Sequence, residues 1–153
     1  MVIYMTDPLP WTDAFSVGHE VLDAEHRRMI GLINQICFAC DAKQREREPE
    51  RQPVVLLEEL EHLTKAHFDH EEAVLRDLSK ATLNHKLRET LSAAGHEHAA
   101  EHVKRLGDLR EMRRALHSDE FATEAKLCAD LTVWFIDHAI VYEAQVKTII
   151  RSA

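Results

Sequence analysis

The chain of 153 residues contains only four glycines and four prolines, and no apolar run approaches the ~20 residues of a membrane-spanning helix. Scarce glycine and proline favour long helices joined by few turns. A formal charge of −8 argues against nucleic acid as a partner, because a phosphate-binding surface needs an excess of basic side chains. The chain also lacks a Gly-rich phosphate loop, a serine nucleophile elbow and an HExxH motif. What remains is the expectation of a single helical domain, residues 1–153.

The chain has three cysteines, and its N-terminus lacks the basic-then-apolar pattern of a signal peptide. Three cysteines fit a reducing compartment, so we expect a cytoplasmic protein. Cys37 and Cys40 form a lone CxxC. Because this pair lies within a predicted helix and follows no strand, we interpret both as small buried residues rather than as a redox or zinc motif.

Hydrophobic periodicity predicts an all-α, up-down-up-down four-helix bundle with an N-terminal arm and an extended or split third helix. The arm contains two large aromatic residues, Trp11 and Phe15, which we expect to pack along the bundle. The third helix is the most ambiguous, because its apolar positions, including Leu83 and Leu87, keep helical phase across Gly95. One long helix and two nearly collinear pieces both fit this pattern. The predicted segments are the arm at 1–18 and helices at about 20–47, from 53, over 83–116 after a turn at 79–82, and from an N-cap at Ser118.

Histidine is the outlier in composition, with eleven residues. Several of these histidines and two glutamates fall on the predicted apolar faces, mostly in pairs four or five positions apart. Residues four apart lie on one face of a helix, one turn from each other. Burying so many imidazoles and carboxylates without a cation would cost several kcal/mol. Imidazole and carboxylate together suit iron, manganese or zinc. We therefore predict a metal centre, di-iron in the first instance, with these ligands: His26, His67, Glu71, His98, His102, His138 and Glu143.

Two alternatives for individual ligands remain open. His85 and Glu89 form a second His-x-x-x-Glu pair, which could replace His98 and His102 as the contribution of the third helix. Tyr142 lies one turn after His138 and could approach the metal, although packing in the core is the simpler interpretation.

Several motifs along the chain resemble those of the hemerythrin family, and most closely those of its single-domain bacteriohemerythrins. The resemblance covers nearly the whole chain. It rests on WTDAFSVG at 11–18, LDAEH at 22–26, HFDHEE at 67–72, HAAEH at 98–102 and WFIDH at 134–138.

This resemblance implies a four-helix bundle that holds a non-heme di-iron centre, oxo- or hydroxo-bridged, with O2 as ligand at one open iron position. It implies the same seven ligands, with two bridging carboxylates, three histidines on one iron and two on the other. The sequence departs from the family at Glu143, where the family has Asp, and in a longer stretch between Glu72 and His98. We interpret 79–95 as a helical insertion that could serve self-association or a protein partner.

Three functions are compatible with such a centre. The first is O2 carriage, storage, delivery or sensing, with a ligand pocket predicted at Met29, Ile30, Phe68 and Trp134 from their positions on the apolar faces. The second is a di-iron enzyme with peroxidase, NO-handling or oxidase activity, acting on peroxide or NO. The third is an iron- or O2-responsive signalling module. Of the three, we expect O2 binding without catalysis.

Overall fold

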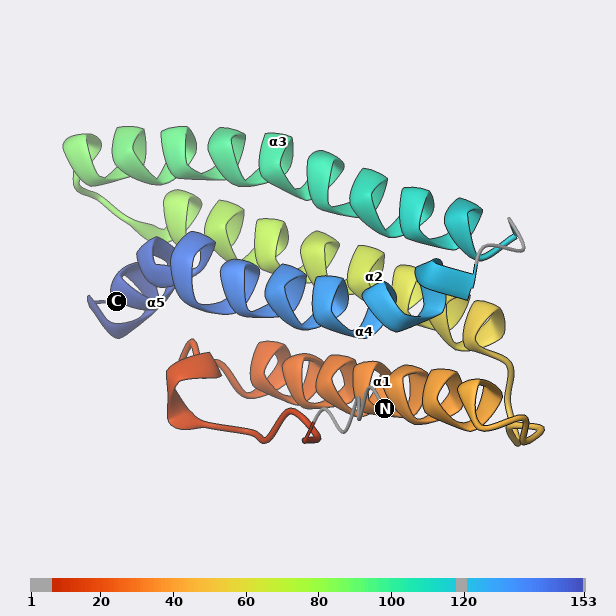
Figure 1. The fold of residues 1–153 in the computed structure, drawn as a ribbon. Coiled ribbons are helices and arrows are strands. Elements are labelled where there is room, and N and C mark those ends of the chain that lie inside the picture. The colour runs from red at the N-terminus through yellow and green to blue at the C-terminus, as the bar shows by residue number, and fades with distance from the viewer. Residues whose placement is uncertain (1–6, 118–120, 153) are drawn as a thin grey trace.

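The computed structural model describes residues 7–117 and 121–152, which form a bundle of four long helices, each antiparallel to the next in the chain (Figure 1). Within these ranges there is no strand, so the predicted all-α bundle is confirmed. A π-helical segment, η2 (Asp137–Tyr142), and the short α5 (Ala144–Ser152) continue the fourth helix, and a 3-10 turn, η1 (Asp13–Phe15), belongs to the arm. The long helices are α1 (Glu20–Gln44), α2 (Pro53–Ala81), α3 (His85–Leu116) and α4 (Phe121–Ile136).

The helix ends follow local sequence signals. Pro53 occupies the first turn of α2, where its missing N–H costs no hydrogen bond. The Asn84 side chain caps α3 by accepting a hydrogen bond of 3.1 Å from the Leu87 backbone N–H. Helix α3 runs without interruption through Gly95, so one long third helix is correct and two separate pieces are wrong. The N-cap predicted at Ser118 lies outside the described residues.

The main hydrophobic core lies between α1, α2 and α4, and the N-terminal arm closes one side of it. The Phe15 ring is buried and meets Phe135 of α4 edge-on, with ring centroids 5.2 Å apart. Trp11 packs edge-on against Phe15 at 6.2 Å. Leu9 and the Asn34 side chain of α1 exchange two hydrogen bonds, of 2.8 and 3.0 Å. The described part of the arm therefore packs along the bundle, as predicted.

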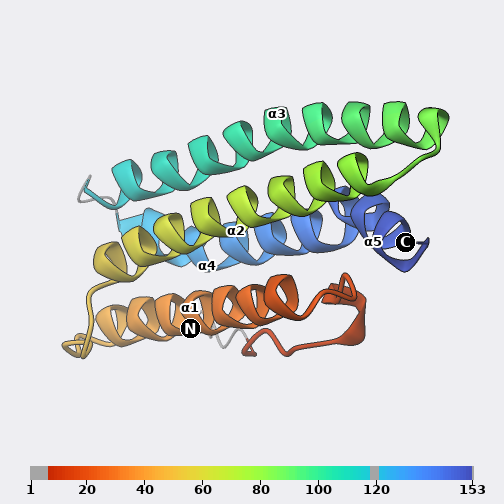
Figure 2. The same ribbon diagram turned by 180° about the vertical axis from the view of Figure 1, so that it is seen from behind.

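Residues 79–95 consist of the end of α2, a short link at 82–84 and the first turns of α3. The predicted turn at Ser79 is wrong, because α2 continues to Ala81. The link lies at the same end of the bundle as α5 and η1, and the α1–α2 connection lies at the other end (Figures 1 and 2). Leu83 is 98% exposed and Leu87 is 45% exposed. Neither side chain belongs to the main hydrophobic core.

Two of the three cysteines differ from the prediction. Cys37 of α1 is joined to Cys128 of α4 by a disulfide, and only Cys40 is a free thiol. The interpretation of Cys37 as merely a small buried residue is therefore wrong. The CxxC spacing gave no sign of it, because the partner lies 91 residues away. Among the described residues no helix is long and apolar enough to cross a membrane.

Candidate metal centre

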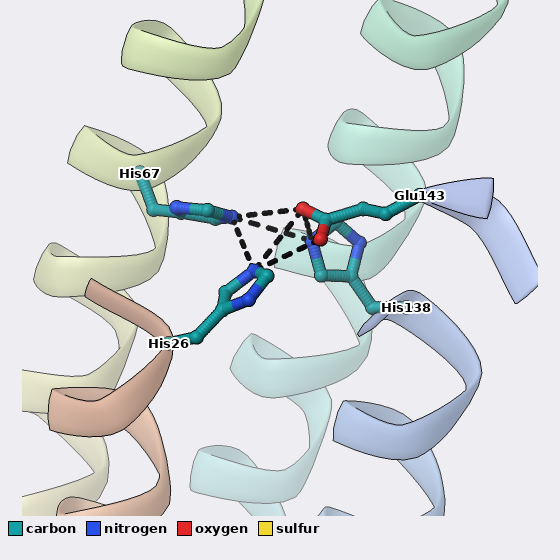
Figure 3. Close-up of side chains that lie close together, drawn as sticks. All are labelled: His26, His67, His138 and Glu143. Carbon is teal, nitrogen blue, oxygen red and sulfur yellow. Dashed lines mark hydrogen bonds and ion pairs between the residues drawn. The ribbon is translucent and has the colours of Figure 1, made fainter. Parts of the chain in front are cut away.

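Two groups of buried side chains in the bundle could each hold a metal ion. Within each group, one ligand atom from every residue lies within 4.8 Å of the others. The first group comes from α1, α2, η2 and the residue after it, and Figure 3 shows its side chains pointing toward one another: His26, His67, His138 and Glu143. The second group comes from α2 and α3: Glu71, His98 and His102.

Glu71 connects the two groups, because its two carboxylate oxygens face different histidines. Oε2 lies 3.5 Å from Nε2 of His67 and 3.8 Å from Nε2 of His138. Oε1 lies 3.3 Å from Nδ1 of His98 and 3.6 Å from Nε2 of His102. One carboxylate thus lies between histidines of both groups, which is the placement that a bridging ligand requires.

Glu143 occupies the centre of the first group. Its Oε1 lies 2.8 Å from Nε2 of His138 and 3.1 Å from Nε2 of His67, and its Oε2 lies 3.0 Å from Nε2 of His26. The Glu143 side chain is 1% exposed. A longer side chain than aspartate therefore reaches all three imidazoles of this group.

The π-helical segment η2 explains how Glu143 reaches this position. In a regular α-helix of 3.6 residues per turn, a residue five positions after His138 would lie roughly 140° around the axis. Instead, the Glu143 backbone N–H donates to the His138 carbonyl at 3.0 Å, an i→i+5 bond that widens the turn. Arg105 of α3 flanks the segment, with a hydrogen bond of 3.2 Å to the Trp134 carbonyl and its guanidinium 4.6 Å from the centre of the Tyr142 ring. Sequence analysis missed this segment, although the five-residue spacing itself was the available signal.

Three of the histidines are oriented by acceptors on their outer nitrogen. His26 Nδ1–H donates to the Phe15 carbonyl at 2.8 Å. His67 Nδ1–H donates to Glu25 at 2.9 Å, and His102 Nδ1–H donates to Glu72 at 2.8 Å.

Such bonds place the Nδ1 proton on the outer side of each ring, so that Nε2 is the nitrogen that faces a metal. Sequence analysis did not assign roles to Glu25 and Glu72, although each directly adjoins a predicted ligand. Glu25 also contacts His70, which extends this network toward the surface.

Among the described residues, some buried polar atoms of the two groups have no hydrogen-bond partner, and they indicate whether these residues fit a metal. Both carboxylate oxygens of Glu71 and Nε2 of His102 are buried and have no hydrogen-bond partner within the described part of the chain. Leaving such groups unpaired costs about 1–3 kcal/mol each, more for a charged one. A cation at their centre would remove that cost, and the nitrogen and oxygen donors suit iron, manganese or zinc. The residues therefore fit a metal site.

Without a metal, the buried histidines and the carboxylate of Glu143 pair with one another and shift each other's pKa. Burial disfavours the charged form of His67, but hydrogen bonds to Glu143 and Glu25 outweigh it and raise the pKa of His67 to about 10. Burial also opposes ionisation of Glu143, yet His138, His26 and His67 hold the pKa of Glu143 well below its usual value. The burial of His138 lowers its pKa. Protons thus occupy part of the cluster, and a metal must displace them.

The two alternative ligands lie elsewhere. The His85 side chain is 82% exposed and pairs only with Glu89, at 3.6 Å, among the described residues. The half-buried Tyr142 ring faces Arg105. The structure brings neither residue into the two groups.

The residues of the predicted pocket are all buried, but they differ in what they touch. The Phe68 ring stacks on His102, with centroids 3.9 Å apart and planes at 5°, and lies 5.0 Å from His138. The Trp134 indole N–H donates to the Arg105 carbonyl at 3.2 Å, which turns its polar edge toward α3. Met29 and Ile30, which both lie on α1, belong to the main hydrophobic core. Of the four, Phe68 and its stacking contact lie directly against the histidines.

Comparison with known proteins agrees with this geometry. The chain is 25% identical to a bacteriohemerythrin of Ralstonia nicotianae over 140 residues, which cover 92% of this chain and 87% of the relative. No solved structure matches. The family model of the hemerythrin HHE cation binding domain matches residues 17–147, a span that includes both histidine groups. The chain therefore belongs to the hemerythrin family.

Proposed function

We propose that this protein binds O2 reversibly at a non-heme di-iron centre. The observation that carries the proposal is the contact of two buried histidine groups through one shared carboxylate, that of Glu71. A di-iron centre supplies O2 with two electrons, one from each ferrous ion. The proposed ligands are the seven side chains of the two groups: His26, His67, Glu71, His98, His102, His138 and Glu143.

The histidines lie on two sides of the Glu71 carboxylate, and each side would hold one ion. His26 and His67 lie at one side of Glu71, and His98 and His102 lie at the other. His138 lies on the side of His26 and His67, with its Nε2 3.4 Å from Nε2 of His67 and 3.8 Å from Oε2 of Glu71, the oxygen that also faces His67. We therefore assign His138 to the side of His26 and His67, which would give three imidazoles to that ion and two, His98 and His102, to the other. The ion with fewer imidazoles would have a position left for O2.

The aromatic side chains around the cluster keep water away from it. The Phe135 ring, which is fully buried, meets His26 edge-on at 5.8 Å, and Phe68 covers His102. Every proposed ligand is at most 4% exposed. A small neutral molecule such as O2 enters such an apolar enclosure more easily than water or an ion, because it loses no hydrogen bonds on entry. This environment favours binding and release over further reaction, and therefore a carrier, store or sensor over an enzyme.

Anaerobic reconstitution with ferrous ion, followed by exposure to air, tests the proposal. We expect about two irons per chain and an absorption change on exposure to air that reverses when O2 is removed. The His85→Ala variant is the matched control, because this histidine is exposed and lies outside both groups. A single iron per chain, or a spectrum unchanged by O2, would contradict the proposal. Rapid turnover of added peroxide or NO would instead indicate an enzyme.

A further inference from the structure

The disulfide between Cys37 and Cys128 lies away from the metal ligands but joins the same two helical segments that carry them. Helix α1 contributes His26 and Cys37, and the fourth helical segment contributes Cys128 and His138. The two segments are antiparallel. The step from His26 to Cys37 along α1 therefore runs beside the step from His138 back to Cys128 along the fourth segment. Ten or eleven residues separate each cysteine from the histidine on its own segment, which at 1.5 Å per residue is about 15 Å. The disulfide is therefore chemically separate from the metal centre.

A surface cavity makes this disulfide accessible. Both cysteines line a cavity of about 490 Å³ bounded by α1, the arm, the α1–α2 connection and α4. Phe38, which is 76% exposed, lies on the same cavity wall. Cys37 is half-buried, whereas Cys128 is 8% exposed. Cys37 is therefore the cysteine of the pair that a small thiol in the cavity would reach first.

The third cysteine does not compete for this bond. Cys40 lies one turn after Cys37 on α1 and is 2% exposed. Burial, together with nearby Glu124, raises the pKa of its thiol to about 12. Only a thiolate attacks a disulfide, so a protonated and buried Cys40 is inert. The exchange chemistry is confined to Cys37 and Cys128.

We propose that Cys37–Cys128 is a thiol–disulfide exchange site whose reaction partner is a dithiol reductant. A thiolate of the dithiol attacks Sγ of Cys37, the Cys37–Cys128 bond breaks, and Cys128 leaves and takes a proton from water. The second thiol of the reductant then attacks the mixed disulfide and releases Cys37. Two electrons pass from the dithiol to the protein, which gains two thiols while the reductant becomes a disulfide.

This site is independent of the proposed O2 binding and fits the compartment that the sequence predicts. In the cytoplasm of mesophiles, disulfides are usually transient and belong to catalytic or redox-responsive sites. Reduction removes the covalent tie between the segments that carry His26 and His138, while the core between α1, α2 and α4 still holds them together. We therefore expect the reduced chain to stay folded.

Reduction by dithiothreitol, followed by acid quenching, unfolding in denaturant, maleimide labelling at neutral pH and counting of the labelled thiols by mass, tests the proposal on the full chain. We expect one thiol per chain before treatment and three afterwards. Direct attack on the folded protein makes the rate proportional to reductant, so about tenfold more dithiothreitol gives about tenfold faster reduction. Circular dichroism should show unchanged helix content throughout. The Cys40→Ser variant keeps the disulfide and should react at the same rate.

Three results would overturn the proposal. Three thiols before treatment would show that the bond does not form. A rate that reaches a plateau as dithiothreitol increases would show that the bond reacts only after unfolding. A Cys40→Ser variant that no longer forms or exchanges the disulfide would make Cys40 one of its partners. None of these readings depends on iron, so failure here is distinguishable from failure of O2 binding.

Discussion

Glu72→Ala should weaken metal binding even though Glu72 belongs to neither histidine group. Its carboxylate accepts a hydrogen bond of 2.8 Å from Nδ1–H of His102. That bond holds the ring so that Nε2 points at Glu71, 3.6 Å away. Without the acceptor, the imidazole loses its fixed tautomer and part of its basicity. Helix α2 itself should be unaffected, because alanine is the best helix former.

The size of the effect follows from this single hydrogen bond. Removing the partner of a ligand histidine typically lowers metal affinity 10- to 100-fold, which corresponds to about 1.4–2.7 kcal/mol. We expect the lower half of this range, because the Glu72 side chain is 33% exposed and water can partly replace it. Glu72→Gln keeps an acceptor without the charge and should lie between the parent and Glu72→Ala.

Competition with a chromophoric chelator under anaerobic conditions measures the affinity for ferrous ion. The matched control is Glu89→Ala, which removes a glutamate from a His–Glu pair of 3.6 Å on the exposed face of α3. The control should bind iron like the parent, because surface changes usually stay within about 0.5 kcal/mol. If Glu72→Ala binds iron as tightly as Glu89→Ala does, then Glu72 does not orient a ligand and the role of His102 is in doubt.

Three further predictions concern the ligands themselves. His102→Ala should lower the iron content measured by elemental analysis, and His85→Ala should not; the reverse result would place the α3 ligands one or more turns too late. Glu143→Ala should lose one or both irons, whereas Glu143→Asp should retain them with a longer-lived O2 complex in the absorption spectrum; unchanged iron and spectrum in Glu143→Ala would exclude it as a ligand. The pKa of His67, raised from 6.5 to about 10, stabilises the metal-free fold fully below pH 6.5, and this contribution is lost as the pH rises through about 10. Urea midpoints of the metal-free protein should therefore fall over that range, and His67→Gln should remove this part of the pH dependence.

Helical spacing and family motifs were sufficient for the fold and for the placement of the seven side chains on inward faces. The reason is that the four helices are long, and their apolar periodicity is a local property. Pro53 gave the start of α2 correctly, whereas the phase kept across Gly95 fitted both one long third helix and two collinear pieces, and the structure shows one helix. The assignment of the seven side chains as ligands remains a prediction that metal analysis must test.

Other features depend on contacts between distant segments, which spacing along one helix does not report. The disulfide pairs residues 91 positions apart, and only the antiparallel register of α1 and α4 brings them together. The acceptor for His26 is a backbone carbonyl, that of Phe15, and no residue type reveals it. Leu83 has the periodicity of a core residue, yet it lies in the link between α2 and α3 and is almost fully exposed. In each case the tertiary arrangement decides the outcome.

The wide turn of η2 has a consequence for length variation in the chain. Inserting one residue into a regular α-helix rotates everything after it by about 100°, which would carry a buried face into solvent. In the fourth helical segment, the wide turn of η2 takes up one residue more than a regular α-helical turn. Leu131 before this turn and Val146 after it are nevertheless both fully buried. The extra residue is absorbed within 137–142 and does not turn the rest of the helix away from the core. This one turn is therefore where the fourth helix can gain or lose a residue and still present a carboxylate to the histidines.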